Sequence, residues 1–277
     1  MIDQAESLRR RMENHHPSVP NYLAISGHSR NSAQSQFCLN LSQTLGEFGK
    51  RVLVIYLGND VQPWTGVPQS ISIAETLNRK QPIKKALVQH RHVSYLRSGS
   101  LLIDKLGGNR DYLKELQMSF NELNGEFDMI LFDFENVNDF ERFGSVFDIL
   151  LFLSKGTKQA VLSTYTMLKK FRLMYQDLEF ACVLIQEKTL GEAVKIGERL
   201  IKVSDHYLKN AFKWISIFPS DSDNTDTVSH PFSLQTIFSR ICARKYLHYI
   251  SQLDGQKNTK FFDRIENSLQ TVRIDQS

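Results

Sequence analysis

"ISGHSRNSAQSQFCLN", residues 25–40, marks the point where a short apolar strand gives way to a helix. In an α/β domain the turn between the first strand and the first helix is the usual phosphate-binding site. The turn here has one glycine, no lysine and a run of Ser, Asn and Gln. The position of this stretch therefore predicts a nucleotide-binding fold. Its composition leaves open whether a nucleotide binds.

Short apolar runs alternate with longer helical stretches along most of the chain. Several runs, such as "VLVIYL", "MILFDF" and "DILLFL", are apolar on both faces, as is typical of parallel strands covered by helices on each side. The pattern predicts an α/β fold with a doubly wound, mostly parallel sheet and helices on both faces. Strands are predicted at 22–26, 51–57, 93–97, 127–134, 147–153, 180–185 and 213–218, and helices at 34–48, 110–123, 156–175, 189–208 and 231–250.

Composition indicates an ordinary globular protein. The 277 residues carry a net charge of +4, which permits anionic partners without requiring them. Each of the three cysteines lies among apolar neighbours, which favours buried thiols in a reducing compartment over disulfides (Cys38, Cys182 and Cys242). The charged N-terminus does not read as a secretory signal, and no apolar run approaches the roughly 18 residues of a membrane span. We therefore expect a cytoplasmic protein.

The chain divides into three predicted parts. The central part, residues 17–255, is the α/β domain. Residues 1–16 contain "DQAESLRRRMEN", a predicted helix in which Asp3 and Glu6 form a capping box, and "HHPSVP" separates it from the first strand. Residues 256–277 form a predicted C-terminal amphipathic tail after the polar "DGQKN".

The predicted phosphate loop lacks the groups that hold phosphate. Such loops use inward backbone N–H groups, glycines that allow close approach, a lysine, and a Ser or Thr that binds Mg²⁺. Here Gly27 begins the loop, Gln34 takes the place of the lysine, and Ser35 stands near the magnesium-binding hydroxyl. A charge-assisted hydrogen bond contributes about 1.5–3 kcal/mol, so loss of the lysine should weaken triphosphate binding about 10- to 150-fold.

The chain resembles the ParA/MinD superfamily of deviant P-loop ATPases, and most closely its flagellar FlhG (YlxH) members, which control flagellar number and placement. That family has an N-terminal DQAxxLR element, then SGKGGVGKS, then GKRVLVID, and later a P…D…V…PF pattern. The matching stretches here are "DQAESLR", "SGHSRNSAQS", "GKRVLVIY", "FDMILFDFEN" and "FPSDSDNTDTVSHPF". The resemblance covers almost the whole chain, and its most specific part is the DQAxxLR element.

The departures from the family pattern are concentrated where the family performs its chemistry. His28 replaces the signature lysine that reaches a partner's nucleotide, Gln34 replaces the second lysine, and Tyr56 replaces the first switch Asp. Asp133 remains at the end of its strand. The resemblance thus implies a degenerate nucleotide site with no catalytic residue, no ATP or Mg²⁺ cofactor and no ATP-dependent dimer, formed by Gly27, His28, Arg30, Gln34, Ser35 and Asp133.

The resemblance also implies a partner for the N-terminal helix. In the family the DQAxxLR segment stimulates the GTPase of FlhF, a signal-recognition-type protein. An amide such as that of Gln4 can orient an attacking water, while Asp3 and Arg9 fix the helix in place. The expected partner-binding residues are Asp3, Gln4, Ala5, Leu8 and Arg9, with flagellar basal-body components as further partners.

The C-terminal tail has an apolar stripe at helical spacing, formed by Phe261, Phe262, Ile265 and Leu269. In the family such a helix associates reversibly with membrane, but a stripe of this kind also suits a helix docked on its own domain. Four Lys or Arg residues oppose three acidic ones from residue 256 onward, so we expect only weak attraction to anionic lipid.

Two alternatives to a non-catalytic flagellar regulator stay open. One is an ATPase whose rebuilt site uses Arg30 and Ser35 around Asp133, with Lys50 as a further source of charge. The other is a positioning protein bound to membrane or nucleoid. A basic stretch over 79–92 suits a solvated helix face or a protein-docking surface, and nucleic acid is not expected because the stretch lacks interleaved aromatic residues. The paired histidines lack ligands at metal-site spacing, so no metal is expected.

Overall fold

The structure is a computed structural model, and it describes residues 20–27, 32–58, 63–99, 110–123, 125–175, 178–186, 190–208, 212–219 and 234–253. The predicted helix within 1–16 and the predicted tail at 256–277 lie outside these ranges, so the division into three parts stays a prediction. The described ranges fall within the predicted α/β domain.

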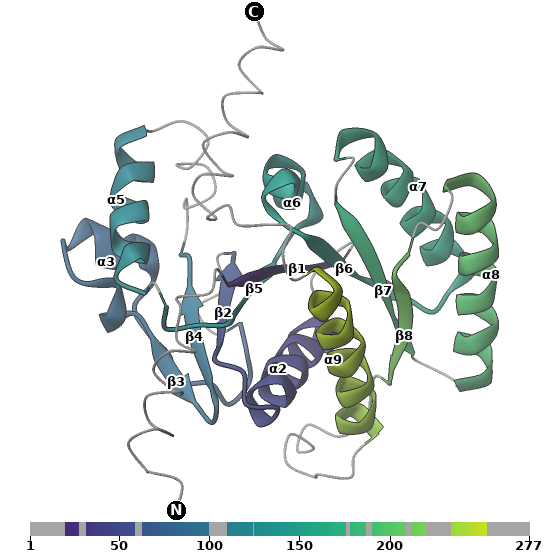
Figure 1. The fold of residues 1–277 in the computed structure, drawn as a ribbon, viewed down its shortest axis with the longest axis horizontal. Coiled ribbons are helices and arrows are strands. Elements are labelled where there is room, and N and C mark those ends of the chain that lie inside the picture. The colour runs from purple at the N-terminus through teal and green to yellow at the C-terminus, as the bar shows by residue number, and fades with distance from the viewer. Residues whose placement is uncertain are drawn as a thin grey trace, which may run out of the picture.

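Eight strands form one sheet in the order β3-β4-β2-β5-β1-β6-β7-β8 (Figure 1). Every pairing is parallel except β3 with β4, which is antiparallel. The doubly wound, mostly parallel α/β fold predicted from the sequence is thus confirmed. The strands are β1 (Asn21–Gly27), β2 (Val52–Leu57), β3 (Val88–His90), β4 (Val93–Arg97), β5 (Met129–Phe134), β6 (Ile149–Lys155), β7 (Glu179–Gln186) and β8 (Trp214–Pro219).

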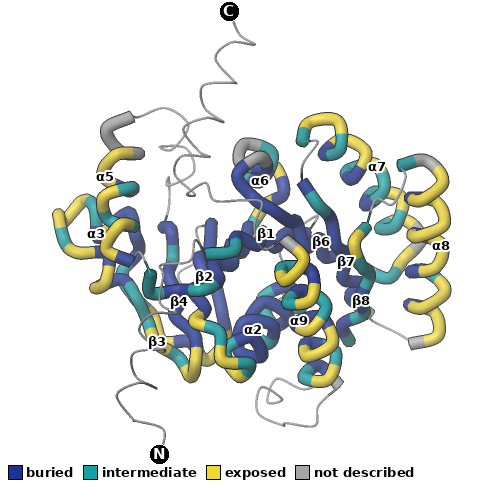
Figure 2. The backbone as a smooth tube through the Cα atoms, in the orientation of Figure 1, coloured by how far each residue is buried: buried dark blue, intermediate teal, exposed yellow. Residues whose placement is uncertain are grey.

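Helices cover both faces of the sheet, and each face has its own hydrophobic core (Figures 1 and 2). The helices α2 and α9 pack against each other on one face, while α3, α5, α6 and α7 cover the other, and α8 packs beside α7. Their bounds are α2 (Ser32–Glu47), α3 (Ile73–Asn78), α5 (Arg110–Asn121), α6 (Val137–Phe143), α7 (Lys158–Met174), α8 (Leu190–Leu208) and α9 (Leu234–Leu253), with 3₁₀ turns η1 (Ile83–Lys85) and η2 (Gly144–Val146).

The central strands are buried on both faces because their side chains alternate between the two cores. In β2, Leu53 and Ile55 contribute to the core under α3 and α5, whereas Val54 and Tyr56 contribute to the core under α2. This alternation explains why the runs apolar on both faces were reliable strand signals.

The basic stretch at 79–92 differs from the expected helix face. It begins at the end of α3, continues through the 3₁₀ turn η1, and ends in the hairpin of β3 and β4. Pro82 precedes η1 and removes a backbone donor, and only three residues pair in β3, so no continuous helix forms here. The solvated-helix interpretation was therefore wrong.

Candidate functional site

The carboxyl ends of β1, β2 and β5 meet at the place where α/β proteins bind their ligands. In the sheet register Asp133 of β5 lies between Ile25 of β1 and Tyr56 of β2. The helix α2 begins at Ser32, after a turn whose residues 28–31, including His28 and Arg30, are outside the described ranges. The structure thus brings Gln34, on the first turn of α2, to Asp133.

Gln34 is bound directly to Asp133. Its side-chain Nε2 donates to Oδ1 of Asp133 at 2.9 Å and to the backbone oxygen of Phe134 at 2.9 Å. Gln34 is 1% exposed and Asp133 is 0% exposed, so the contact is fully buried. The side chain of Gln34 therefore points to the Asp133 carboxylate.

Trp64 occupies the other oxygen of the same carboxylate. Its indole Nε1 donates to Oδ2 of Asp133 at 3.1 Å, and the side chain is 2% exposed. The indole ring contacts Tyr56 and Tyr95, with ring centroids 5.9 and 5.0 Å away. Both oxygens of Asp133 thus accept hydrogen bonds from neutral N–H groups, and aromatic rings pack around the indole.

Gly27 and Tyr56 lie close to the contact between Gln34 and Asp133. A Cβ atom on Gly27 would lie only 3.1 Å from Oε1 of Gln34 and 3.1 Å from the backbone oxygen of Leu153, so a glycine lets the Gln34 amide approach β1 closely. Tyr56 is fully buried, and its hydroxyl lies near Gly58. Ser35 is half-buried on the first turn of α2.

Among the described residues, the side-chain donors of Gln34 and Trp64 are not directed outward to a ligand. Phosphate binding depends on cations and on backbone donors aimed at the ligand, whereas the Gln34 and Trp64 donors are directed to Asp133. A ligand that uses Asp133 would have to displace both. Each hydrogen bond to a charged group contributes about 1.5–3 kcal/mol, so the two together oppose binding by about 3–6 kcal/mol.

Cysteine and histidine side chains are the other candidates for a chemical role. Cys38, Cys182 and Cys242 are buried and form no disulfide, as the sequence predicted, and burial raises the pKa of the Cys242 thiol to about 12. His90 and His92 belong to the β3–β4 hairpin. Within the described ranges, no three His, Cys, Asp or Glu side chains gather as a metal site.

None of the helices in the described part of the chain combines the length and apolar composition needed to cross a bilayer.

Sequence reasoning missed Trp64. The residue lies in the loop between β2 and α3, in "QPWTGVP", and no periodic pattern in that loop indicates a buried side chain. Its contact with Asp133 spans 69 positions in the sequence. The local sequence signal is a tryptophan between Pro63 and Pro68, a few residues after the end of β2.

The α/β fold is similar to that of MinD and plasmid partition proteins of known structure. The MinD cell division protein of Aquifex aeolicus matches with a TM-score of 0.58 at 17% identity, over 82% of this chain and 97% of that chain. A putative plasmid partition protein from Borrelia burgdorferi B31 bound to AMPPNP matches with a TM-score of 0.59 at 15% identity, over 84% and 100% of the two chains.

A third similar structure is an enzyme, cobyrinic acid a,c-diamide synthase from Mycobacterium smegmatis with bound ATP analogue and magnesium. Its TM-score is 0.58 at 16% identity, and the match covers 87% of this chain and 98% of that chain. No protein-family model and no curated protein matches the sequence. The likeness therefore establishes the fold alone.

Proposed function

We propose that this protein is a non-catalytic regulator of flagellar number, placement or assembly, built on a MinD/ParA-like fold. It acts as a scaffold that binds and stimulates an FlhF-type GTPase through its N-terminal helix. The observation that carries the non-catalytic part is the closure of Asp133 by Gln34 and Trp64. The cell division and plasmid partition proteins among the similar structures support a positioning role for the fold.

The closed site supports a scaffold because it stabilises the domain without a ligand. In the family pattern a lysine and two acidic residues surround the nucleotide and its magnesium. Here Gln34, Trp64 and Asp133 bind one another, and Tyr56 fills the second acidic position with a buried ring. His28 replaces the family lysine that would bridge two nucleotide-bound subunits. We therefore propose that no ATP-dependent dimer forms.

The activating role rests on the N-terminal element. "DQAESLR" keeps the family pattern, whereas the phosphate loop has lost its own. We assign Gln4 to orienting the water that attacks GTP in the partner, with Asp3 and Arg9 holding the helix in place. Weak, peripheral membrane contact through 256–277 is a separate part of the proposal, and liposome flotation before and after removal of 258–277 tests it.

Full-length protein is expected to raise GTP turnover by an FlhF-type GTPase, and Gln4→Ala is expected to lower that stimulation at least about tenfold. A loss of about 1.4 kcal/mol of transition-state stabilisation gives a tenfold lower rate. Ser7→Ala is the matched control, because Ser7 lies at a variable position of the same element. Equal stimulation by the Gln4→Ala and wild-type proteins would contradict the assignment.

A further inference from the structure

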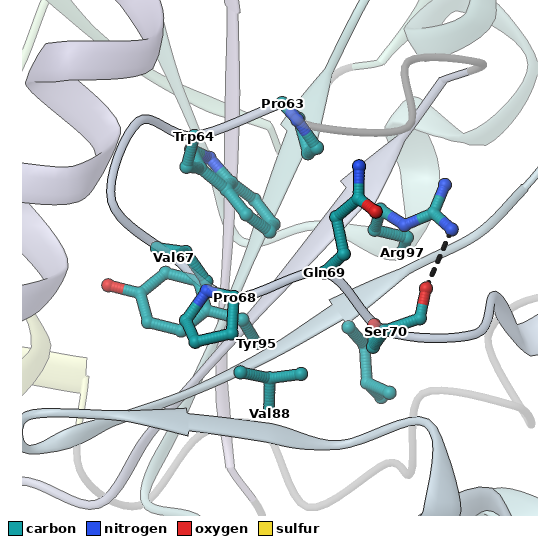
Figure 3. A pocket seen from close by; sticks show the side chains of 10 residues that line it. Pro63, Trp64, Val67, Pro68, Gln69, Ser70, Val88, Tyr95 and Arg97 are labelled. Atoms are coloured by element: carbon teal, nitrogen blue, oxygen red, sulfur yellow. Dashed lines mark hydrogen bonds between the residues drawn. The ribbon is translucent and has the colours of Figure 1, made fainter.

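The small pocket beside Trp64 has a volume of about 10 Å³, which is room for about one water molecule (Figure 3). Its apolar lining is buried, since Trp64, Val67 and Tyr95 are 2%, 5% and 1% exposed. The Arg97 guanidinium in the lining donates to the backbone oxygen of Ser70 at 2.8 Å. A partner that binds the described part of the protein would therefore use its outer surface rather than this pocket.

Exposed apolar side chains gather on two neighbouring helices, α7 and α8. These helices pack against each other on one face of the sheet (Figures 1 and 2). Among the described residues, they carry six of the nine large apolar side chains that are exposed: Leu162, Leu173, Met174, Val194, Ile201 and Val203. Single apolar side chains are ordinary on a protein surface, whereas a concentration on adjacent elements is typical of a binding surface.

The outward face of α7 carries two leucines and a lysine. Successive residues of an α-helix are rotated by about 100°, so Leu162, Lys169 and Leu173 lie within about 40° of one another. Leu162 is 63% and Leu173 is 77% exposed, and Lys169 is exposed as well. Lys170, by contrast, lies toward α6, where its Nζ pairs with Glu141 at 2.6 Å. At a rise of about 1.5 Å per residue, the two leucines mark a stripe about 16 Å long, or three helical turns.

The contacts of α8 show how this helix is oriented. A Cβ atom on Gly197 would lie 3.3 Å from Leu184 of β7 and 3.8 Å from Ile215 of β8, so this flank of α8 faces the last two strands. Ile196, on the opposite flank, joins the same small hydrophobic cluster as Val161 of α7. That flank of α8 therefore faces α7.

The two flanks of α8 differ in charge. Lys195, Arg199 and Val203 follow one another at intervals of four residues, on the side of Ile196 and α7, and all three are exposed. Glu198 and Asp205 are exposed on the other side, nearer to Gly197. The α8 side chains next to α7 are therefore mainly basic and apolar.

The α7–α8 surface consists of Leu162, Lys169 and Leu173 of α7 and Lys195, Arg199 and Val203 of α8. Within the described ranges, none of its three cations belongs to an ion pair. The acidic residue on the same flank is Glu192, in the first turn of α8, where a carboxylate is favoured by the helix dipole. The rest of the surface thus presents positive charge beside an apolar stripe.

Such a surface suits an amphipathic helix that has acidic residues beside its apolar stripe. A stripe of about three turns is the contact that an amphipathic helix offers, and flanking carboxylates would pair with the cations. An anionic membrane fits less well, because Glu198 and Asp205 are also exposed on α8 and would be repelled by it.

We propose that the α7–α8 surface binds an acidic amphipathic helix of a partner protein. The apolar stripe of that helix lies against the two leucines of α7 and against Val203, and its acidic residues pair with the three cations. The surface is formed by other residues than the N-terminal segment and the closed site. The proposal therefore goes beyond the proposed function and does not depend on it.

The probe is a fluorescein-labelled peptide of about 20 residues, long enough to cover the stripe of about 16 Å as a helix. It consists of alanine, leucine and glutamate, with leucine at every third or fourth position and glutamate on both sides of the leucines. Full-length protein is titrated into the peptide at physiological ionic strength, and binding should raise the anisotropy of the label. A second peptide, with glutamine in place of every glutamate, should bind at least about tenfold more weakly.

Two double variants test the two parts of the surface. Lys169→Glu with Arg199→Glu should weaken binding of the glutamate peptide about tenfold or more, because attraction becomes repulsion. Leu162→Asn with Leu173→Asn should weaken it by a similar factor, because apolar burial is lost. All four positions are exposed, so the unfolding midpoint of the protein should not change.

Each variant has a matched control on another part of the fold. The charge control is Lys80→Glu with Lys85→Glu, exposed near the β3 end of the sheet. The apolar control is Ile237→Asn with Ile241→Asn on α9, where the side chains are 45% and 41% exposed. Each control should change binding less than twofold.

Three results would overturn the proposal. The first is no binding of the glutamate peptide, or equal binding of the glutamine peptide. The second is an equal loss in the control variants, which would indicate attraction to net charge or to any apolar surface. The third is tighter binding of phosphatidylserine vesicles or of a DNA duplex, lost in the Lys169 and Arg199 variant, which would assign the surface to another class of partner.

Discussion

Replacing Trp64 by alanine is expected to lower the free energy of unfolding by about 4 kcal/mol. Truncation of a buried tryptophan typically costs about 3–5 kcal/mol, because packing is lost and a cavity is left. Trp64 is 2% exposed, packs against Tyr56 and Tyr95, and donates to Asp133. Urea denaturation followed by circular dichroism measures the change.

Trp64→Phe separates packing from hydrogen bonding. It keeps an aromatic ring but removes the N–H that binds Oδ2 of Asp133, so a smaller loss of about 1–3 kcal/mol is expected. If the Trp64→Ala variant were as stable as the wild type, Trp64 could not be the side chain that covers Asp133, and the account of the closed site would be wrong.

Gln34→Glu is expected to destabilise the fold by about 4 kcal/mol at about pH 7. The new carboxyl would face the Asp133 carboxylate at the position where Nε2 now lies 2.9 Å from Oδ1. Two adjacent buried carboxylates cannot both ionise easily, so the new group would stay protonated in the folded protein. Holding that proton costs about 1.4 kcal/mol for each pH unit above the ordinary pKa of about 4.3, and the bond to Phe134 is also lost.

The sign of the pH dependence makes this variant diagnostic. The folded state of the variant binds more protons than the unfolded state, so its deficit relative to wild type should grow from about pH 5 to about pH 8. Gln34→Met is the control of similar length, since it removes the same donors without adding a charge, and its deficit should not grow in this way. Denaturation at several pH values measures both. A deficit in Gln34→Glu that is independent of pH would place its side chain away from Asp133.

The long elements of the fold could be predicted from the sequence because their burial follows a simple pattern. Strand β4 lies where it was predicted, and β2 and β5 lie within two residues of their predicted starts. The start of α7 was predicted two residues early, because Thr157 caps the helix by accepting from the backbone N of Ala160 at 3.2 Å. Caps of this kind decide boundaries that periodicity leaves open.

The short elements could not be predicted in the same way. Helix α3 has six residues, α6 has seven and β3 has three, so none spans enough residues to show a period. The two helices are fixed by contacts with distant parts of the chain. The backbone N of Ala74 in α3, for example, donates to the backbone oxygen of Ser98 at 3.1 Å, and α6 packs against β1.

The sequence indicated where in the fold the candidate site would lie, but not which side chains contact one another there. The turn after β1 and the end of β5 follow from the fold, and the family pattern points to Gln34 and Asp133. The hydrogen bond between them crosses 99 sequence positions, and the Trp64 contact crosses 69. No local rule predicts which donors a buried carboxylate will find, although burial itself requires that it find some.

The most direct test of the central claim is calorimetric titration of the full-length protein with Mg-ATP. A site whose carboxylate is already bound by Gln34 and Trp64 should give no saturable heat at millimolar nucleotide. Saturable binding of one ATP per chain, abolished by Asp133→Asn in a variant that still folds, would contradict the account. It would mean that the turn after β1 forms a working nucleotide-binding site.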